Sequence, residues 1–292
     1  MISSSIRTGL IALCSLCLGT AVLAQTPAAP KLEFPQASPL ASVSQRIGLT
    51  DIQVTYNRPG AKGRVVFGGL VPYGHVWRTG ANNATKISFS TPVKLNGATV
   101  PAGTYELFTI PGKDEWTVII HKNMSQWGAY TYDQKNDVAR IKAVPVALTN
   151  GVETLGISFN DLRDESGTLN IAWEKVRVPV TISVDVKSTL VPQIEAVMAS
   201  GGDKLPYAEA SMYYLANDLD LQKAAAWMDA AIAANPQAFY LVYRKALILE
   251  KMGDKAGAIA AAQKSIDGAN QAGGAIKEEY VALNEALINR LK

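Results

Sequence analysis

The sequence has little of the chemistry that most enzymes and metal sites use. Its only two cysteines, Cys14 and Cys17, lie within the first 24 residues, and its only histidines are His75 and His121. The rest of the chain therefore has no disulfide, no thiolate nucleophile and no cysteine metal ligand. It also has no HExxH motif and no phosphate-binding loop that ends in GK[ST]. We therefore expect neither a metal nor an organic cofactor, and catalysis stays an open question.

Charge of one sign is also scarce. The net charge is +3, and neither half of the chain carries the excess of Lys and Arg that is typical of nucleic-acid binding. The imbalance that exists is local, because the stretch from Ser44 to Thr79 has one acid, Asp51, and several basic residues. Those basic residues are Arg46, Arg58, Lys62, Arg64 and Arg78. We expect no nucleic-acid partner.

The N-terminus has the pattern of a cleavable signal peptide over residues 1–24. Arg7 precedes an apolar run from Leu10 to Leu18, and small residues lead up to Ala24, after which we predict cleavage. A membrane anchor is the alternative, but the run is shorter than the ~20 apolar residues of a spanning helix. The sequence predicts a periplasmic or secreted protein that begins at Gln25 and has no transmembrane segment after cleavage. Residues 25–40, rich in Pro and Ala, are predicted to be a flexible linker.

Residues 41–187 show the two-residue periodicity of β-strands. Ile52, Val54 and Tyr56 alternate with polar residues, and Asn96-Gly97 between apolar flanks is a strong hairpin signal. A strand with one buried and one solvated face is typical of antiparallel sheets, and this many short strands require a barrel or two packed sheets. We favour an antiparallel β-sandwich.

The chain after residue 187 is rich in Ala and helical in pattern, so the fold class is β + α. Residues 188–204 are predicted as a helical linker and residues 205–292 as a small all-α domain. The predicted helices are Leu190–Ser200, Pro206–Asn217, Leu221–Asn235, Gln237–Met252, Lys255–Ala269 and Ala275–Leu291. A shift of 34 residues aligns Ala224 with Ala258 and Ile232 with Ile266. This spacing resembles about two tetratricopeptide repeats with a capping helix, and an unrelated helical array is the alternative.

Three segments of the predicted sandwich resemble one protein family. They are IGLTDIQVTYNRPGAKGRVVFGGLVPYGHVWRTGANNAT at residues 47–85, PAGTYELFTIPG at 101–112 and EWTVIIHKNMSQWGAY at 115–130. Their order and spacing resemble the DUF2911 family of exported bacterial proteins, from about Ser44 to Val186. The resemblance implies a cell-envelope location and no particular activity.

The polar, Gly- and Pro-rich stretch from Tyr56 to Thr85 carries most of the candidate ligand-binding residues. Arginine binds carboxylate or phosphate with its planar fork, while Trp and Tyr stack on sugars or apolar rings. The candidates are Arg58, Arg64, Tyr73, His75, Trp77, Arg78, Asn82 and His121. The alternative is structural: the arginines would bond carbonyls of long loops over a sheet edge, and Trp77 would fill the core. Trp127 and Tyr130 would extend an aromatic surface or fix the loop that contains them.

Three functions follow from these observations. The first is a non-catalytic envelope protein that binds a glycan, peptide or anionic small molecule and docks a protein partner on its helical tail. The second is an envelope hydrolase that uses His75 or His121 with nearby Arg and Tyr in residues 56–85 and 115–130. The third is a scaffold that acts only through the tail. An exposed aromatic row would favour glycan binding, and a convergent cluster of both histidines would favour the enzyme.

Overall fold

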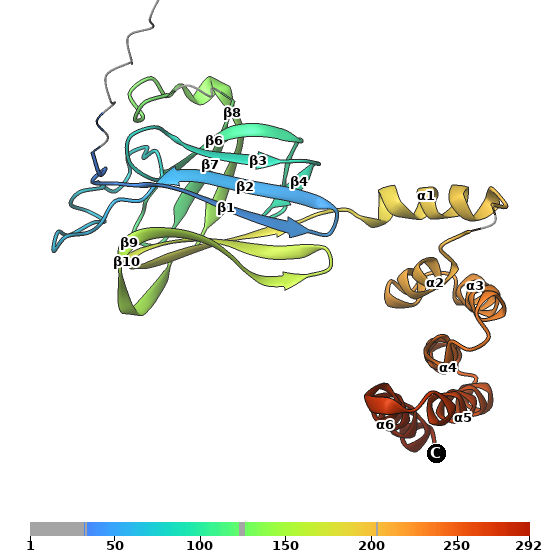
Figure 1. Ribbon diagram of the computed structural model, residues 1–292. Coiled ribbons are helices and arrows are strands. Elements are labelled where there is room, and N and C mark those ends of the chain that lie inside the picture. The colour runs from blue at the N-terminus through green and yellow to red at the C-terminus, as the bar shows by residue number, and fades with distance from the viewer. Residues whose placement is uncertain (1–31, 33, 123–125, 203) are drawn as a thin grey trace, which may run out of the picture.

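The computed structural model describes residues 32, 34–122, 126–202 and 204–292, so the predicted signal peptide lies outside the described residues. Figure 1 shows two parts: antiparallel sheets in the N-terminal portion, followed by helices. This arrangement confirms the predicted β + α fold class. None of the helices in the described ranges is long and apolar enough to cross a membrane.

One layer of the sandwich is a six-stranded antiparallel sheet in the order β1-β2-β3-β6-β7-β8. Its strands are β1 (Leu40–Ile47), β2 (Thr50–Asn57), β3 (Thr85–Phe89), β6 (Gly103–Ile110), β7 (Trp116–His121) and β8 (Asp137–Ala143). In β2, Ile52 and Val54 are buried while Asp51 and Gln53 are exposed, as the alternation of the sequence predicts.

The second layer is a four-stranded sheet in the order β5-β4-β10-β9. Its strands are β4 (Val93–Leu95), β5 (Ala98–Val100), β9 (Val146–Arg163) and β10 (Ser166–Ser183). Asn96 and Gly97 join β4 to β5 with φ angles of 45° and 88°. Positive φ at both positions is the requirement of a type I′ turn, which explains why Asn-Gly was a reliable hairpin signal.

An irregularity in β10 lets both halves of this long strand face the same core. Leu169, Ile171 and Trp173 are buried at odd positions, whereas Val178 and Val180 are buried at even ones. The phase changes at Glu174, which has a φ of 54° and lies between two register shifts against β9. Such a bulge inserts an extra residue and moves the following side chains to the opposite face. Two apolar runs that look out of phase in the sequence therefore form one strand.

Six helices follow the sandwich in the described part of the chain (Figure 1). They are α1 (Lys187–Ala199), α2 (Tyr207–Ala216), α3 (Leu221–Ala234), α4 (Phe239–Met252), α5 (Lys255–Ala272) and α6 (Gly274–Leu291). The first helix begins earlier than predicted. The Asp185 carboxylate accepts a hydrogen bond of 3.0 Å from the Ser188 N–H, which satisfies a donor that the helix start leaves free.

Small buried residues let the tail helices approach each other closely. Ala224 and Ala258, which the 34-residue shift aligns, both have 0% exposure, and Ser265 is equally buried. The Ser265 hydroxyl donates to the Phe239 carbonyl at 2.9 Å, which joins α5 to the start of α4. Similarity to tetratricopeptide repeats stays a prediction that these contacts are compatible with.

Two side chains connect the tail to the sandwich. Leu190 of α1 and Tyr213 of α2 pack against the core cluster of the sandwich. Within the tail, the Lys187 ammonium at the start of α1 donates to the Asn217 carbonyl at the end of α2 at 2.9 Å. The tail therefore rests on the sandwich through a few contacts and has its own separate clusters of buried residues.

Candidate functional site

The first candidate arginines, Arg58 and Arg64, donate to backbone carbonyl groups of strand β9 and of the loop itself. The Arg58 Nε donates to the Leu155 carbonyl of β9 at 2.9 Å. The Arg64 Nε donates to the Ala61 carbonyl at 2.9 Å, and its Nη2 donates to the Gly60 carbonyl at 2.7 Å. These contacts favour the structural alternative for both residues, because their guanidinium groups satisfy backbone acceptors that loops leave free.

Trp77 belongs to the aromatic core between the two sheets. It is 8% exposed, and its ring stacks on that of Trp173 with centroids 5.9 Å apart. Trp116 and Phe67 meet the same ring edge to face. The Trp77 indole nitrogen donates to the Gly80 carbonyl at 3.1 Å. Trp77 thus fills the core, and its hydrogen bond fixes the loop backbone at Gly80, two residues after Arg78.

Arg78 differs from the other loop arginines. It is partly buried, and within the described residues its guanidinium makes no hydrogen bond or ion pair; its Nε is completely covered. Burial lowers the pKa of the Arg78 guanidinium from its ordinary value, and the nearby Tyr130 hydroxyl partly offsets this effect. A cation that has lost water without gaining a partner is destabilising, so an anionic ligand would compensate for that loss.

Asn82 and Asn83 attach the loop that contains Arg78 to a second loop. The Asn82 carbonyl accepts a hydrogen bond of 3.1 Å from the Gly128 N–H, and Asn83 forms an antiparallel bridge with Trp127. Asn82 has a φ of 57°, a left-handed conformation that Asn tolerates better than most residues. This pairing brings the residue range 78–83 next to the range 126–130, although the two are far apart in the sequence.

A polar cavity of about 520 Å³ opens beside this junction. Its lining combines amide, hydroxyl and small apolar side chains and carries no charged residue: Gln36, Ala37, Ser38, Leu40, Asn57, Asn82 and Asn83. The Asn57 side chain donates to the Ser38 carbonyl at 3.0 Å, which fixes one wall. Such a cavity offers neutral donors and acceptors to a polar ligand.

The two aromatic residues of the second loop form an exposed platform. Trp127 is 62% exposed and Tyr130 is 79% exposed. Their rings stack with centroids 5.8 Å apart and planes inclined by 20°. Large apolar surface is often buried, so this stacked pair in solvent is a candidate interaction surface. We call Arg78, Asn82, Asn83, Trp127 and Tyr130 the loop-end site.

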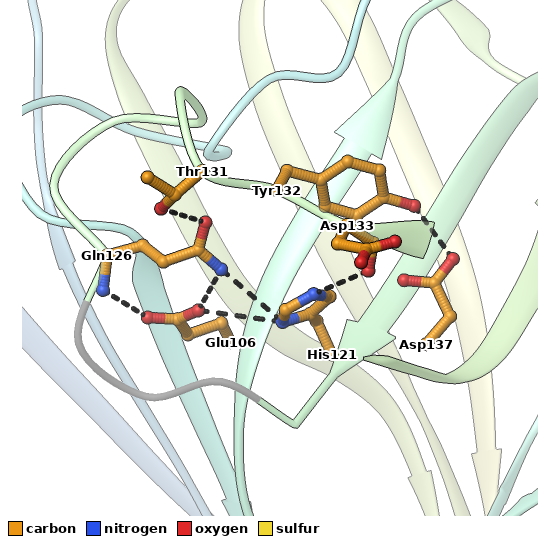
Figure 2. A network of polar contacts seen from close by, with 7 residues as sticks. All are labelled: Glu106, His121, Gln126, Thr131, Tyr132, Asp133 and Asp137. Atoms are coloured by element: carbon orange, nitrogen blue, oxygen red, sulfur yellow. Dashed lines mark hydrogen bonds and ion pairs between the residues drawn. The ribbon is translucent and has the colours of Figure 1, made fainter. Parts of the chain in front are cut away.

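A buried polar network holds residues 126–133, which we call the platform loop, on the outer face of the six-stranded sheet (Figure 2). Glu106 on β6 is 1% exposed, and its carboxylate accepts from the Gln126 backbone N–H at 2.9 Å and from the Gln126 side-chain amide at 2.8 Å. The Thr131 hydroxyl donates to the Gln126 side-chain oxygen at 3.0 Å. Gln126 precedes Trp127 directly, so this carboxylate fixes the first residue of the platform loop.

His121 lies beside Glu106 in the same network. It has 0% exposure, and its Nδ1 is 3.7 Å from the Glu106 carboxylate. Its Nε2 lies 3.1 Å from the Asp133 carbonyl, which only accepts, so Nε2 carries a proton. His121 therefore binds the far end of the platform loop, as Figure 2 shows. The strand register also places Glu106 opposite His121, and His121 opposite Asp137.

Tyr132 continues the network toward the surface. Its hydroxyl donates to the Asp137 carboxylate at 2.7 Å and accepts from the Arg140 guanidinium at 2.8 Å. Burial, followed by the hydrogen bond to Asp137, raises the pKa of Tyr132 to about 12. Beneath these groups, Phe108 and Ile119 form a small apolar cluster on the outer face of the sheet. The platform loop is thus fixed by both polar and apolar contacts.

The eight predicted site residues occupy different environments. Tyr73 and His75 are exposed on the long loop between β2 and β3 (residues 58–84), Trp77 lies in the core between the sheets, and His121 is buried on the outer face of the sheet. Arg78 and Asn82 lie at the loop-end site. A ligand-binding role for these residues stays a prediction, which the geometry favours most for Arg78 and Asn82.

Several residues of the site were missed or left undecided by sequence reasoning. Glu106 gave a signal, because a single carboxylate interrupts the apolar run YELFTI of its strand. Gln126 and Asn83 gave none, since their roles depend on backbone pairing between distant loops. No group of three or more His, Cys, Asp or Glu that could hold a metal is found among the residues described.

Comparison with known proteins identifies one family. The family model DUF2911, described as a protein of unknown function, matches residues 38–182. This range covers nearly all strands of the sandwich and supports the resemblance that the three motifs predicted. No curated protein and no solved structure matches the chain.

Proposed function

We propose that this protein, a member of the DUF2911 family through its residues 38–182, is a non-catalytic carbohydrate-binding module of the cell envelope. The observation that carries the proposal is the stacked, exposed pair of Trp127 and Tyr130, held rigidly by a buried network. Flat aromatic rings in water stack on the apolar faces of sugar rings at a low entropic cost.

The surroundings of the platform also fit a sugar. Sugar hydroxyl groups both donate and accept hydrogen bonds, as do the amides of Asn82 and Asn83 and the polar groups of the adjacent cavity. Preorganisation adds to the fit, because the carboxylate of Glu106 and the ring of His121 fix the two ends of the platform loop. A platform that is already ordered loses little conformational freedom when a ligand binds.

The placement of the histidines favours binding over hydrolysis. His121 is fully buried, and its ring contacts Glu106, Gln126 and the Asp133 carbonyl. His75 is exposed on the loop between β2 and β3. A hydrolytic site requires an acid or base within hydrogen-bond reach of a substrate, and a buried histidine is poorly placed for that role.

Export and the tail complete the proposal. The predicted cleavage after Ala24 would deliver the sandwich to the periplasm or beyond, and the helical tail would dock a protein partner. This location is supported if the intact mass of exported material corresponds to a chain that begins at Gln25. Retention of residues 1–24 in a membrane fraction contradicts it.

The test of carbohydrate binding compares matched variants on a panel of envelope oligosaccharides by calorimetry. Trp127→Ala and Tyr130→Ala should each weaken binding at least ~5-fold, because each removes a stacking surface worth about 1–3 kcal/mol. Trp127→Phe should retain most of the affinity. Val144→Ala, at an apolar residue 67% exposed outside the loop-end site, is the control and should bind like the wild type. Equal binding by all four variants refutes the proposal.

A further inference from the structure

The arginines of the sandwich differ in whether their charge is already satisfied. Arg58 and Arg64 donate to carbonyls, and Arg140 pairs with Asp137 at 2.8 Å. Arg46 and Arg163 also have contacts, and Arg177 is exposed to solvent. Among the described residues of the sandwich, Arg78 is therefore the one partly buried arginine whose guanidinium has no hydrogen bond or ion pair.

The neighbours of Arg78 leave its charge uncompensated. The loop-end site contains two asparagines and two aromatic residues besides Arg78, and the adjacent cavity is lined by neutral residues. The Tyr130 hydroxyl is close enough to affect the guanidinium electrostatically. The site thus combines an aromatic platform, neutral hydrogen-bonding groups and one unpaired cation, with no acid to compete for it.

This combination identifies a class of ligand. A guanidinium binds a carboxylate through two parallel, charge-assisted hydrogen bonds, and these are stronger where water is partly excluded. The ring of the same ligand would stack on Trp127 and Tyr130, while its hydroxyl groups would meet the asparagine amides. A neutral sugar would satisfy the platform and leave the charge of Arg78 unpaired.

We propose that the loop-end site selects acidic sugars, in which a pyranose ring carries a carboxylate, and that Arg78 is the residue that binds the carboxylate. This inference rests on the proposed carbohydrate-binding function and adds a charge requirement to it. Arg78 is then a specificity-determining residue, whereas Trp127 and Tyr130 supply affinity for any sugar ring.

The experiment uses two ligands of nearly the same shape. Trimers of galacturonic acid carry carboxylates, and their methyl esters present the same rings without the charge. The wild-type chain without residues 1–24 should bind the acid at least ~10-fold more tightly than the ester, because charge-assisted hydrogen bonds are roughly twice as strong as neutral ones. Raising the salt concentration should reduce this preference, since part of the site is open to solvent.

Variants then assign the preference to Arg78. Arg78→Met should lose the preference and bind the acid and the ester with similar affinity. Arg64→Met, which removes a charge from the same long loop, should keep the preference in its folded fraction. The wild-type comparison of acid and ester is informative even if Arg78→Met does not fold.

The outcomes separate the two proposals. Equal binding of acid and ester by the wild type overturns the role of Arg78 and leaves carbohydrate binding intact. A preference that survives in Arg78→Met also overturns the role of Arg78. Absence of binding to either trimer and to every neutral oligosaccharide overturns both proposals.

Discussion

At the scale of single residues, Glu106 holds the loop-end site in place without belonging to it, through its two hydrogen bonds from Gln126. A carboxylate with 1% exposure is stable only when its oxygens are hydrogen-bonded, and Gln126 provides both bonds. The two hydrogen bonds that compensate for the burial of Glu106 also fix Gln126, the residue before Trp127. The buried charge therefore orders a surface feature.

Replacing Glu106 by Gln should destabilise the protein by about 1–3 kcal/mol. The new amide has one oxygen, so it can accept only one of the two hydrogen bonds from Gln126, and its NH2 group would face the other donor. The measurement is the free energy of unfolding in urea. Glu115→Gln is the matched control, since its ion pair with Lys142 involves side chains that are 49% and 66% exposed. Exposed ion pairs contribute little, so the control should change stability by less than ~0.5 kcal/mol. Equal stability of the two variants would show that the network does not hold the loop.

At the scale of elements, β9 is an edge strand of the four-stranded sheet, and the long loop covers this edge by hydrogen-bonding to it. The Tyr56 hydroxyl accepts from the Ile157 N–H at 2.8 Å, and the Arg58 guanidinium donates to the Leu155 carbonyl. Backbone pairing continues further along, where the Ala61 N–H donates to the Glu153 carbonyl at 2.7 Å. Side chains and loop backbone thus replace the neighbouring strand that an edge lacks, which also protects the edge from pairing with other chains.

The closed edge gives a prediction for Arg58. The change Arg58→Met keeps the apolar stem but leaves the Leu155 carbonyl without its donor, which should cost about 1–3 kcal/mol of folding free energy. Arg177→Met on β10 is the control, because Arg177 is exposed and its loss should be nearly neutral. Thermal melting of both variants provides the measurement. A wild-type melting temperature for Arg58→Met would mean that the loop closes the edge without this residue.

At the scale of the whole molecule, the sandwich and the tail have separate cores and a small shared surface. The sandwich cluster includes residues from both sheets, whereas the tail contributes Leu190 and Tyr213 to its margin. We therefore keep the predicted boundaries, with residues 41–187 as one domain and 205–292 as another, as a proposal about independent folding.

Deleting residues from Lys204 onward should leave a folded sandwich that retains α1. The truncated protein should keep its β-type circular dichroism and a cooperative melt, with a modest decrease in melting temperature because Tyr213 no longer covers the core. Tyr213→Ala in the full-length chain is the control and should reproduce most of that decrease. Loss of the cooperative melt on truncation would show that the two parts share one core and that the boundary is wrong.

The predictability of the site differs from residue to residue. Trp77 and the arginines were recognised as residues of a structured loop. Sequence alone did not separate Arg58 and Arg64, which donate to carbonyls, from Arg78, whose guanidinium has no partner in the described part of the chain. That distinction depends on whether a carbonyl lies within 3 Å of the guanidinium, which for Arg58 is a matter of contact with β9, 97 residues away in the chain. The alternation of β7 puts His121 on the face opposite Val118 and Ile120, and only the loop that covers this face determined its burial.

The sequence by itself determined the fold class, the strand alternation, the Asn96-Gly97 turn and the match to the DUF2911 family model, because these depend on local periodicity, backbone preference and ordered motifs. Only the tertiary structure decided that Glu106 and His121 are buried beneath a loop, that Arg78 is unpaired, and that Asn83 meets Trp127. These features arise from contacts between segments distant in the chain, and a side chain's type does not specify which carbonyl, carboxylate or ring will lie beside it. Neither of the two loops that form the loop-end site has a distinctive periodicity. The site exists because backbone pairing joins them in the folded chain.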